Sequence, residues 1–314
     1  MRFWPRAVLL VSLAAAGCGD EAGLPPPPNS NLPGCKSDDD CDAQPVLRAC
    51  RNQQCVDPGC PYGGTYIAAG AFSRGCGKND PDCEPSAQPV HAVTLTHSYC
   101  LGRTELSVAQ YRECVTAGRC PGPPELQCSN DFATWTPAPG PNEQLPMSCL
   151  FYSEAAAACA YLGGRLPTEA EWEKAARGRD NRTFPWGRAT PVSCDQGVNW
   201  AGTSCPGAPW TATATNRSGA MVRSAAQAVD MAGNLWEWTA DYYAEDAYAA
   251  CADGCVDPQG PASGILRSRR GGSFQSAQTK ELRTYFREFD LPEMQRYDGN
   301  GVRCLFPVPP SPSR

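Results

Sequence analysis

The chain has 314 residues, of which 41% are hydrophobic and 19% are charged, and it contains 30 Gly and 31 Pro. This composition excludes a coiled coil and a disordered chain, and it predicts a turn-rich globular protein of about two domains. The formal net charge of −6 argues against nucleic acid as the main partner. The 19 cysteines indicate an oxidising compartment, a metal, or both.

The first 18 residues have the features of an export signal. Arg2 and Arg6 precede an apolar stretch over residues 7–13, which is too short to span a bilayer. Small residues then lead to Cys18, an arrangement that resembles the bacterial lipobox, in which the cysteine thiol is acylated. The resemblance implies a lipoprotein signal peptide over residues 1–17 and a lipid anchor at Cys18. An ordinary secretory signal is the alternative.

Localisation follows from the same segment. The residue after Cys18 is Gly19, whereas an aspartate at this position would signal retention in the inner membrane. We therefore expect an exported lipoprotein of the outer membrane that faces the periplasm or the cell surface. Anchoring would be by acyl chains alone, because no other apolar run approaches the ~20 residues of a spanning helix.

Two short segments separate this anchor from the main domain. Residues 18–34 include four consecutive prolines and predict an extended spacer. Residues 35–60 hold five cysteines, which predict a small module stapled by disulfides. Zinc is the competing interpretation, but the segment lacks closely spaced cysteine pairs. Cys60 is a candidate for a disulfide with the following domain.

Residues 61–306 predict one large domain, and residues 307–314 predict a disordered tail. Residues 64–67 and 90–96 are typical of strands, because they are rich in β-branched side chains and partly alternate in polarity. Long loops rich in Gly, Pro and Asn dominate the second half of the domain.

Capping residues and apolar spacing predict three helices in this domain, over residues 107–115, 153–162 and 168–178. Ser107 and Gln110 form a capping box at the start of the first helix. Ser153 and Thr168 are the expected N-caps of the other two. Trp172 is expected to face the core from the third helix.

Several longer motifs occur in one order along this domain. They are Gly164–Gly178 (GRLPTEAEWEKAARG), Phe184–Gly187 (FPWG), Asp230–Thr239 (DMAGNLWEWT), Arg270–Phe274 (RGGSF) and Gly301–Cys304 (GVRC). This series closely resembles the sulfatase-modifying-factor family, whose founding members are formylglycine-generating enzymes. The resemblance covers residues 61–306 and implies an α+β fold, a variant of the C-type-lectin fold with little regular secondary structure.

The resemblance fails at the positions that carry the family's oxidative chemistry. Formylglycine-generating oxidases have two cysteines, three and eight residues after the serine of the RGGS motif, and these thiolates bind copper(I). In this chain the two positions are Ser276 and Glu281. Neither side chain is a soft ligand, so the sequence predicts that copper does not bind and that no catalytic residues are present.

Other metals give weaker predictions. The resemblance implies a structural calcium site at Asn199, Asn234 and Glu237, whose oxygen donors suit a hard cation. Non-haem iron, used by another branch of the superfamily, needs clustered histidines. His91 and His97 are ~20 Å apart along an extended strand, too far to share an ion.

The remaining motifs favour structural roles. Glu169, Glu171 and Glu173 are spaced by two, which places neighbours on different helix faces and disfavours acid–base chemistry. The resemblance implies a disulfide between Cys159 and Cys304. Cys251 and Cys255 are interpreted as a local disulfide.

Six basic residues concentrate positive charge in residues 267–287, a stretch that could bind an anionic peptide or glycan. Its members are Arg267, Arg269, Arg270, Lys280, Arg283 and Arg287. The resemblance instead implies that Arg270 and Arg303 are buried hydrogen-bond donors.

Two hypotheses of function follow. The first is an exported lipoprotein whose domain is a non-catalytic binding or structural module for a protein, peptide or glycan. The second is a protein-modifying oxidase that generates formylglycine from a substrate cysteine. The intact framework supports the second, whereas Ser276 and Glu281 favour the first.

Overall fold

The computed structural model describes residues 36, 49–51, 54–56, 58–77, 79–122, 128, 132–188, 198, 200–201, 223–294 and 296–310. Three short α-helices and twelve strands of two to seven residues make up the regular structure of this part of the chain. The predicted signal peptide, Cys18, the spacer and much of the cysteine-rich module lie outside the described residues. None of the described helices is long and apolar enough to cross a membrane.

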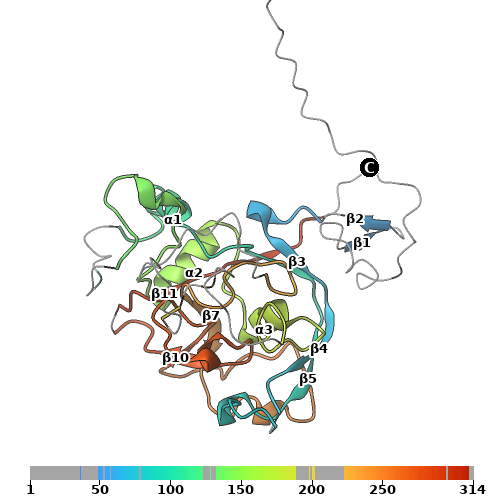
Figure 1. Ribbon diagram of the computed structural model, residues 1–314. Coiled ribbons are helices and arrows are strands. Elements are labelled where there is room, and N and C mark those ends of the chain that lie inside the picture. Colours follow the sequence, from blue (N-terminus) through green and yellow to red (C-terminus); the bar gives the residue numbers. More distant parts are fainter. Residues whose placement is uncertain are drawn as a thin grey trace, which may run out of the picture.

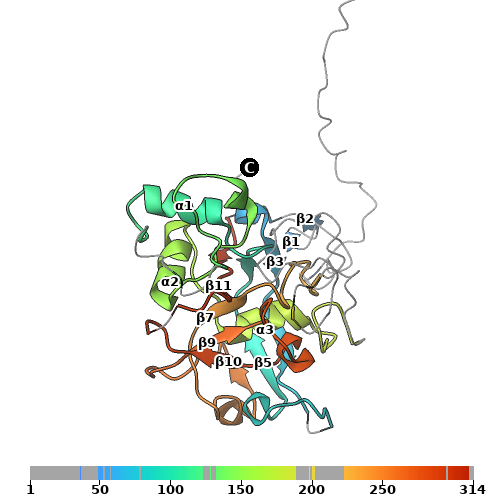
Figure 2. The ribbon, with the colours of Figure 1, turned by 60° about the vertical axis from the view of Figure 1, so that its left-hand side comes forward.

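The helices and strands have the following bounds (Figures 1 and 2). The helices are α1 (Val108–Thr116), α2 (Tyr152–Tyr161) and α3 (Glu169–Arg177). The strands are β1 (Ala49–Arg51), β2 (Gln54–Val56), β3 (Thr65–Ile67), β4 (Gly70–Arg74), β5 (His91–Leu95), β6 (Tyr99–Leu101), β7 (Trp236–Tyr242), β8 (Cys255–Val256), β9 (Arg267–Arg270), β10 (Glu288–Asp290), β11 (Asn300–Gly301) and β12 (Leu305–Pro307).

The capping residues predicted for α1 and α3 are confirmed. Gln110 N donates to the Ser107 hydroxyl at 3.3 Å, and the Gln110 side chain accepts from Ser107 N at 3.0 Å. Thr168 and Glu171 form the same reciprocal pair at the start of α3. These bonds satisfy backbone N–H groups that have no partner within a helix.

The prediction for α2 is wrong by one residue, and its expected N-cap is replaced. The helix begins at Tyr152 with Phe151 as N-cap, and Ser153 lies inside it. Phe151 N donates to the Glu154 carboxylate at 2.9 Å, so half of a capping box forms without a hydroxyl at the N-cap. The Ser153 hydroxyl donates instead to Glu293 at 3.0 Å.

Short strands form four small sheets. The largest has the order β10-β9-β7-β11, and two three-stranded sheets have the orders β12-β6-β3 and β4-β5-β8. The β1–β2 hairpin is antiparallel and lies beside β3 at the periphery of the molecule in both views (Figures 1 and 2). β12 ends at Pro307, which pairs with Tyr99 of β6, so the last strand extends one residue past the predicted domain end.

Helix α3 occupies the middle of the fold. It contacts β4, β7 and β9, and both views place it between the sheets (Figures 1 and 2). Trp172 is fully buried, as predicted, in a core that includes Leu101 and Met231. A second core lies between α1 and α2 and includes Tyr111 and Trp238. The motif helix therefore packs against both the β10-β9-β7-β11 sheet and the β4-β5-β8 sheet.

Six disulfides bind the described part of the chain together. They are Cys60–Cys100, Cys76–Cys83, Cys114–Cys120, Cys128–Cys149, Cys159–Cys304 and Cys251–Cys255. The structure thus has the long-range Cys159–Cys304 bridge and the local Cys251–Cys255 bridge that the sequence suggested. Cys60 does pair into the following domain.

Candidate functional site

The RGGS motif forms a tight turn at the end of β9. Gly271 and Gly272 have φ values of 95° and 79°, in the left-handed region that favours glycine. A Cβ on Gly272 would lie 3.0 Å from Leu282 Cδ2 and 3.2 Å from the Ser276 hydroxyl. The two glycines therefore let the chain fold back so that Ser276 packs against the turn.

Ser276 and Glu281 stand where the resemblance places the two copper-binding cysteines of the family's oxidases. Ser276 is buried, and its hydroxyl accepts a hydrogen bond from Ser273 N at 3.0 Å. Glu281 lies in a 3₁₀ helix over Thr279–Leu282. Copper(I) prefers thiolates over hydroxyl and carboxylate oxygens. Because the sequence has no cysteine in positions 256–303, the donor set of this site does not fit copper(I).

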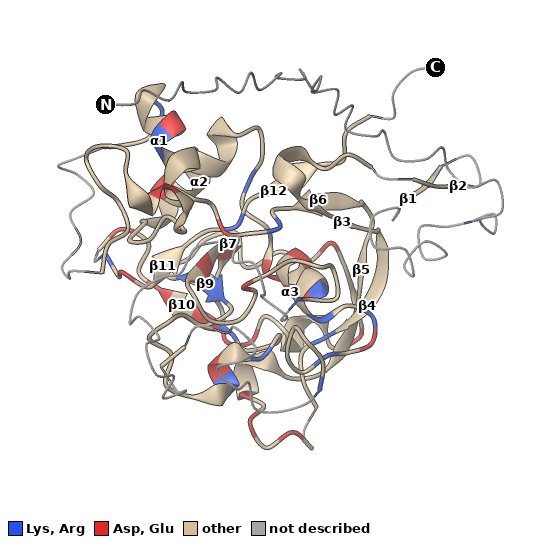
Figure 3. Cartoon of the chain, turned by 45° about the horizontal axis from the view of Figure 1, so that its top comes forward, with Lys and Arg blue, Asp and Glu red and all other residues tan. Residues whose placement is uncertain are grey.

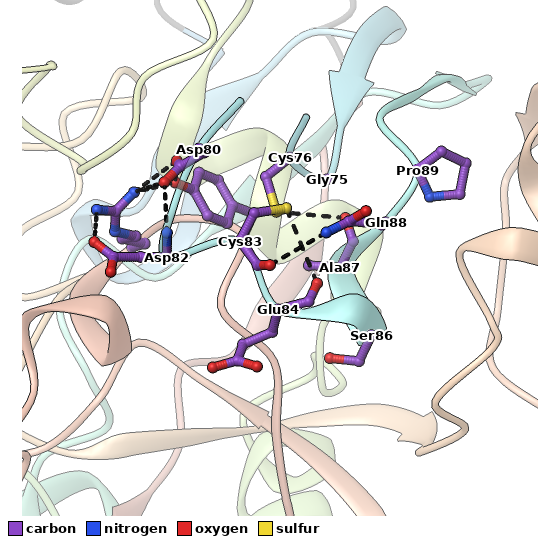
Figure 4. The surroundings of a disulfide bond; sticks show 12 residues. Gly75, Cys76, Asp80, Asp82, Cys83, Glu84, Ser86, Ala87, Gln88 and Pro89 are labelled. Carbon is purple, nitrogen blue, oxygen red and sulfur yellow. Dashed lines mark hydrogen bonds and ion pairs between the residues drawn. A yellow bond between two sulfur atoms is a disulfide. The ribbon is translucent and has the colours of Figure 1, made fainter. Parts of the chain in front are cut away.

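A loop closed by the Cys76–Cys83 disulfide contacts the chain that follows Glu281 (Figure 4). Arg283 donates to both carboxylate oxygens of Asp80, at 2.7 and 2.6 Å. The hydroxyl of Tyr285 also donates to Asp80. The chain just after the second cysteine position is therefore fixed by a charged contact with a distant loop.

The six basic residues in positions 267–287 do not form an open cationic patch. Five of them pair with carboxylates among the described residues: Arg269 with Asp290, Arg270 with Glu169 and Glu173, Lys280 with Glu84, Arg283 with Asp80 and Asp82, and Arg287 with Glu169. Arg267 is the exception, because the described residues provide it with no carboxylate partner. Its guanidinium stacks on the rings of Tyr242 and Tyr152, at 3.4 and 4.1 Å from their centroids.

Glu169 and Glu173 of α3 share one buried helix face, and four arginines surround them. This α3 cluster consists of Glu169, Glu173, Arg74, Arg177, Arg270 and Arg287. Figure 3 shows the charged residues of α3 and β9 close together in the middle of the molecule. Burial alone would raise the pKa of Glu173, but Arg270, Arg177 and Arg74 outweigh it and lower the pKa to about 2.

A second charged cluster joins the DMAGNLWEWT motif to the GVRC motif. This Arg303 cluster consists of Glu105, Asp230, Asn234, Glu237 and Arg303. Arg303 donates to both oxygens of Glu237, at 2.6 and 3.0 Å, and Trp172 Nε1 donates to Glu237 at 2.6 Å. Asn234 Nδ2 donates to Glu105 at 2.6 Å.

The expected calcium site overlaps this Arg303 cluster. Asn199 lies outside the described residues. Glu237 is fully buried and its carboxylate is neutralised by Arg303, so it fits an internal ion pair better than a cation ligand. The described residues include no group of three or more His, Cys, Asp or Glu that could hold a metal. The calcium site stays a prediction.

The two histidines do not converge on one point. His91 is buried, its Nδ1 lies 2.8 Å from Pro89 O, and its ring packs edge-on against Tyr248. Burial lowers the pKa of His91. His97 is exposed, and its Nδ1 contacts the Thr96 hydroxyl at 2.7 Å. Within the described part of the chain, neither ring belongs to a group of side chains that could hold a metal ion.

The comparison with known protein families agrees with the order of motifs along the chain. The sequence model of the family described as "Sulfatase-modifying factor enzyme 1-like domain" matches residues 62–307. The chain belongs to this family. The formylglycine-generating enzyme of Thermomonospora curvata is 35% identical over 161 residues, which cover 45% of this chain and 50% of that protein. The hercynine oxygenase of Mycolicibacterium thermoresistibile is 35% identical over 174 residues, covering 52% of this chain and 36% of that protein.

Solved structures of the sulfatase-modifying-factor type confirm the fold. PvdO from Pseudomonas aeruginosa has a TM-score of 0.61 at 22% identity, covering 76% of this chain and 92% of that one. Treponema denticola variable protein 1 has a TM-score of 0.57 at 22% identity, covering 78% and 95%. The α+β, C-type-lectin-like fold is thus confirmed. The chain spans half or less of the length of these two curated relatives.

Two features of the site were missed by the sequence interpretation. The sequence interpretation compares only neighbours spaced by two. Glu169 and Glu173 are spaced by four, and this spacing puts them on one helix face. Glu171 alone turns outward, where it pairs with Arg165 at 2.6 Å. The cavity beside Asp241 and Arg267 had no motif to indicate it, because its walls come from five distant segments.

Proposed function

We propose that the domain is a non-catalytic binding or structural module of an exported lipoprotein. The donor set at the two cysteine positions carries this proposal. Ser276 is buried and hydrogen-bonded to its own turn, and Glu281 is a hard oxygen donor. A domain with these residues keeps the family scaffold while it lacks the thiolates that would hold copper(I).

The experiment is an assay of formylglycine formation by the mature protein. Purified protein is loaded with copper and incubated with a peptide that contains the cysteine motif of sulfatases, and the product is measured by mass. The formylglycine-generating enzyme of Thermomonospora curvata serves as the positive control. We expect no conversion above a metal-free sample. Conversion above that control would overturn the proposal and favour the alternative, a protein-modifying oxidase.

A double variant makes this assay sharper. Ser276→Cys/Glu281→Cys supplies two thiols at the positions in question, and copper(I) binding is measured by competition with a colorimetric chelator. We expect binding by the double variant and none by the native protein. Equal copper(I) binding by both proteins would contradict the assignment of Ser276 and Glu281 as the reason for lost metal affinity.

The membrane anchor is part of the same proposal and has its own test. The residues before Cys18 support acylation of its thiol, which would leave the domain tethered to the outer membrane by lipid alone. Palmitate labelling in a bacterial host is expected for the native chain and is expected to disappear in Cys18→Ala. Labelling that persists in the variant would refute the anchor.

Structural calcium is proposed on the resemblance alone. Calcium that binds only the folded state raises the unfolding temperature. A thermal midpoint that does not change when a chelator is added would remove calcium from the proposal.

A further inference from the structure

A cavity of 550 Å³ opens beside the N-terminal end of α3. Its walls come from the end of β5, the start of α3, the end of β7, the loop over residues 257–262 and the first residue of β9. The volume lies within the range of small-ligand sites. It is separate from the turn that carries Ser276 and Glu281, since neither residue lines it.

Arg267 supplies one wall of this cavity with a fixed positive charge. Its guanidinium is held over Tyr242 and Tyr152, and its Nη1 donates to Ala240 O at 2.7 Å. No described carboxylate pairs with it, in contrast to the other five basic residues of the same stretch. A guanidinium that is already oriented loses little entropy when it binds a carboxylate.

Asp241 supplies a negative charge from the neighbouring strand. Its two oxygens accept hydrogen bonds from Glu169 N at 2.8 Å and Gly260 N at 2.6 Å. None of the ion pairs among the described residues involves Asp241. Burial, together with the charge of Glu169, raises its pKa to about 6 and outweighs the opposing effects of Arg74 and of the two backbone hydrogen bonds.

The other charged groups around the cavity already have partners. Arg165 forms a two-pronged pair with Glu171, at 2.7 and 2.6 Å. Asp257 accepts a hydrogen bond from Thr96 N at 2.8 Å. Among the described residues, the cavity therefore has one cation, Arg267, and two carboxylates, Asp241 and Asp257, that form no ion pair, and it also has apolar walls. The apolar wall residues include Leu95, Pro258 and Pro261.

We propose that this cavity binds a small zwitterion with a free carboxylate and a free ammonium, the chemistry of an amino acid or a short peptide with free termini. The carboxylate meets Arg267, the ammonium meets Asp241, and the apolar walls receive the side chain. The inference rests on the proposed binding function and gives it a ligand class and a place.

Other ligand classes match the charges less well. A neutral glycan would leave Arg267 and Asp241 without an ionic partner when it displaced water, which costs free energy. A nucleotide would bring phosphates into a cavity lined by Glu171, Asp241 and Asp257. The distance between the two termini of a peptide depends on its length, because each added residue separates them by up to about 3.5 Å more.

The test uses calorimetry on the native protein with alanine, dialanine and trialanine. We expect at least one of these to bind, and the most favoured length separates an amino acid ligand from a peptide ligand. N-acetylation or C-terminal amidation of the best binder is expected to weaken binding at least tenfold. The proposal is overturned if none binds at millimolar concentration, if the capped forms bind equally well, or if only a neutral disaccharide binds.

Variants locate the binding to this cavity. Arg267→Gln and Asp241→Asn are each expected to weaken binding at least tenfold, with far-ultraviolet circular dichroism confirming the fold. Arg112→Gln is the matched control, because Arg112 also stacks on an aromatic ring, Trp135, but lies outside the cavity. Unchanged binding in both cavity variants, or an equal loss in the control, overturns the assignment.

The outcome is independent of the formylglycine assay. Zwitterion binding that depends on Arg267, together with formylglycine formation, would leave the cavity intact and overturn only the non-catalytic proposal. No zwitterion binding and no formylglycine formation would overturn only the ligand assignment.

Discussion

The α3 cluster and the Arg303 cluster are both buried, and Trp172 contacts both. The guanidinium of Arg270 lies over the Trp172 ring, 5.2 Å from its centroid. The indole Nε1 of Trp172 donates to Glu237 of the other cluster. The α3 cluster has four arginines for two carboxylates, and the Arg303 cluster has one arginine for three. Burial is the same in the two places, so the ratio of charges decides which protonation state each carboxyl prefers.

This difference is visible in the direction of the pKa shifts. The pKa values of Glu169 and Glu173 are lowered to about 2, because their arginines outweigh burial. Burial, with Asp230 and Glu237 nearby, raises the pKa of Glu105 well above its usual range. The surroundings of Glu105 therefore favour its neutral form, whereas those of the α3 carboxyls favour the ionised form.

Glu173→Gln is expected to give the largest effect. The substitution leaves Arg270, Arg177 and Arg74 with too little negative charge in a buried site, and breaking such a network costs about 3–5 kcal/mol. Urea unfolding of the variant measures the loss.

Glu143→Gln is the control for this comparison, because its pair with Arg112 is part-exposed and is expected to contribute less than about 1 kcal/mol. A loss below about 1 kcal/mol for Glu173→Gln would show that the charge ratio does not decide the stability of the α3 cluster.

Acid titration is expected to give the next largest effect. A carboxyl whose folded pKa is lowered contributes stability that is present above its unfolded pKa of about 4.5 and is lost as pH falls towards 2. Glu169 and Glu173 each contribute on the order of 3 kcal/mol in this window. The free energy of unfolding, measured from pH 6 to pH 2, is expected to fall steeply below pH 4.5 in the native protein and less steeply in Glu173→Gln. Parallel curves would contradict the low pKa of Glu173.

Glu105→Gln is expected to give the smallest effect, about 1 kcal/mol or less, because the amide resembles the neutral acid that the raised pKa favours. The stability that Glu105 contributes changes with pH in the opposite direction to the stability that Glu169 and Glu173 contribute. A carboxyl with a raised folded pKa contributes stability that is present below about pH 4.5 and is lost as pH rises. The variant is thus expected to gain stability relative to the native protein as pH rises above about 4.5, as measured by thermal unfolding. A variant that loses stability over this range would show that Glu105 is ionised.

Local signals in the sequence predicted a good part of the fold. The capping residues Ser107 and Thr168 predicted where α1 and α3 begin, because a hydroxyl that accepts from a backbone N–H is a local arrangement. The start of α2 was missed, since Glu154 caps Phe151 from inside the helix. The family motifs predicted the overall architecture and the burial of Arg270 and Arg303, which are fully buried.

Long-range pairings could not be predicted in the same way. The contact of Arg283 with Asp80 joins residues 203 positions apart, and nothing local to either residue indicates it. The sequence alone does not show that Arg267 lacks a carboxylate partner among the described residues. This becomes clear only once the ion pairs of the other five basic residues in positions 267–287 are known. The expectation that copper(I) does not bind depends only on the residue types at positions 276 and 281, and it stays a prediction.

The disulfides also decide how the domain carries mechanical load. Cys60 is bonded to Cys100 on β6, and Cys159 is bonded to Cys304 just before β12. Tension applied between the N-terminal segment and the C-terminus passes through these two bonds, so the chain over residues 61–99 and 160–303 is bypassed. Both bypassed stretches, which hold β3 to β5 and all of α3, β7 and β9, are shielded from extension. Between the two bonds the force passes along residues 100–159, and the Cys114–Cys120 and Cys128–Cys149 bridges shorten that path.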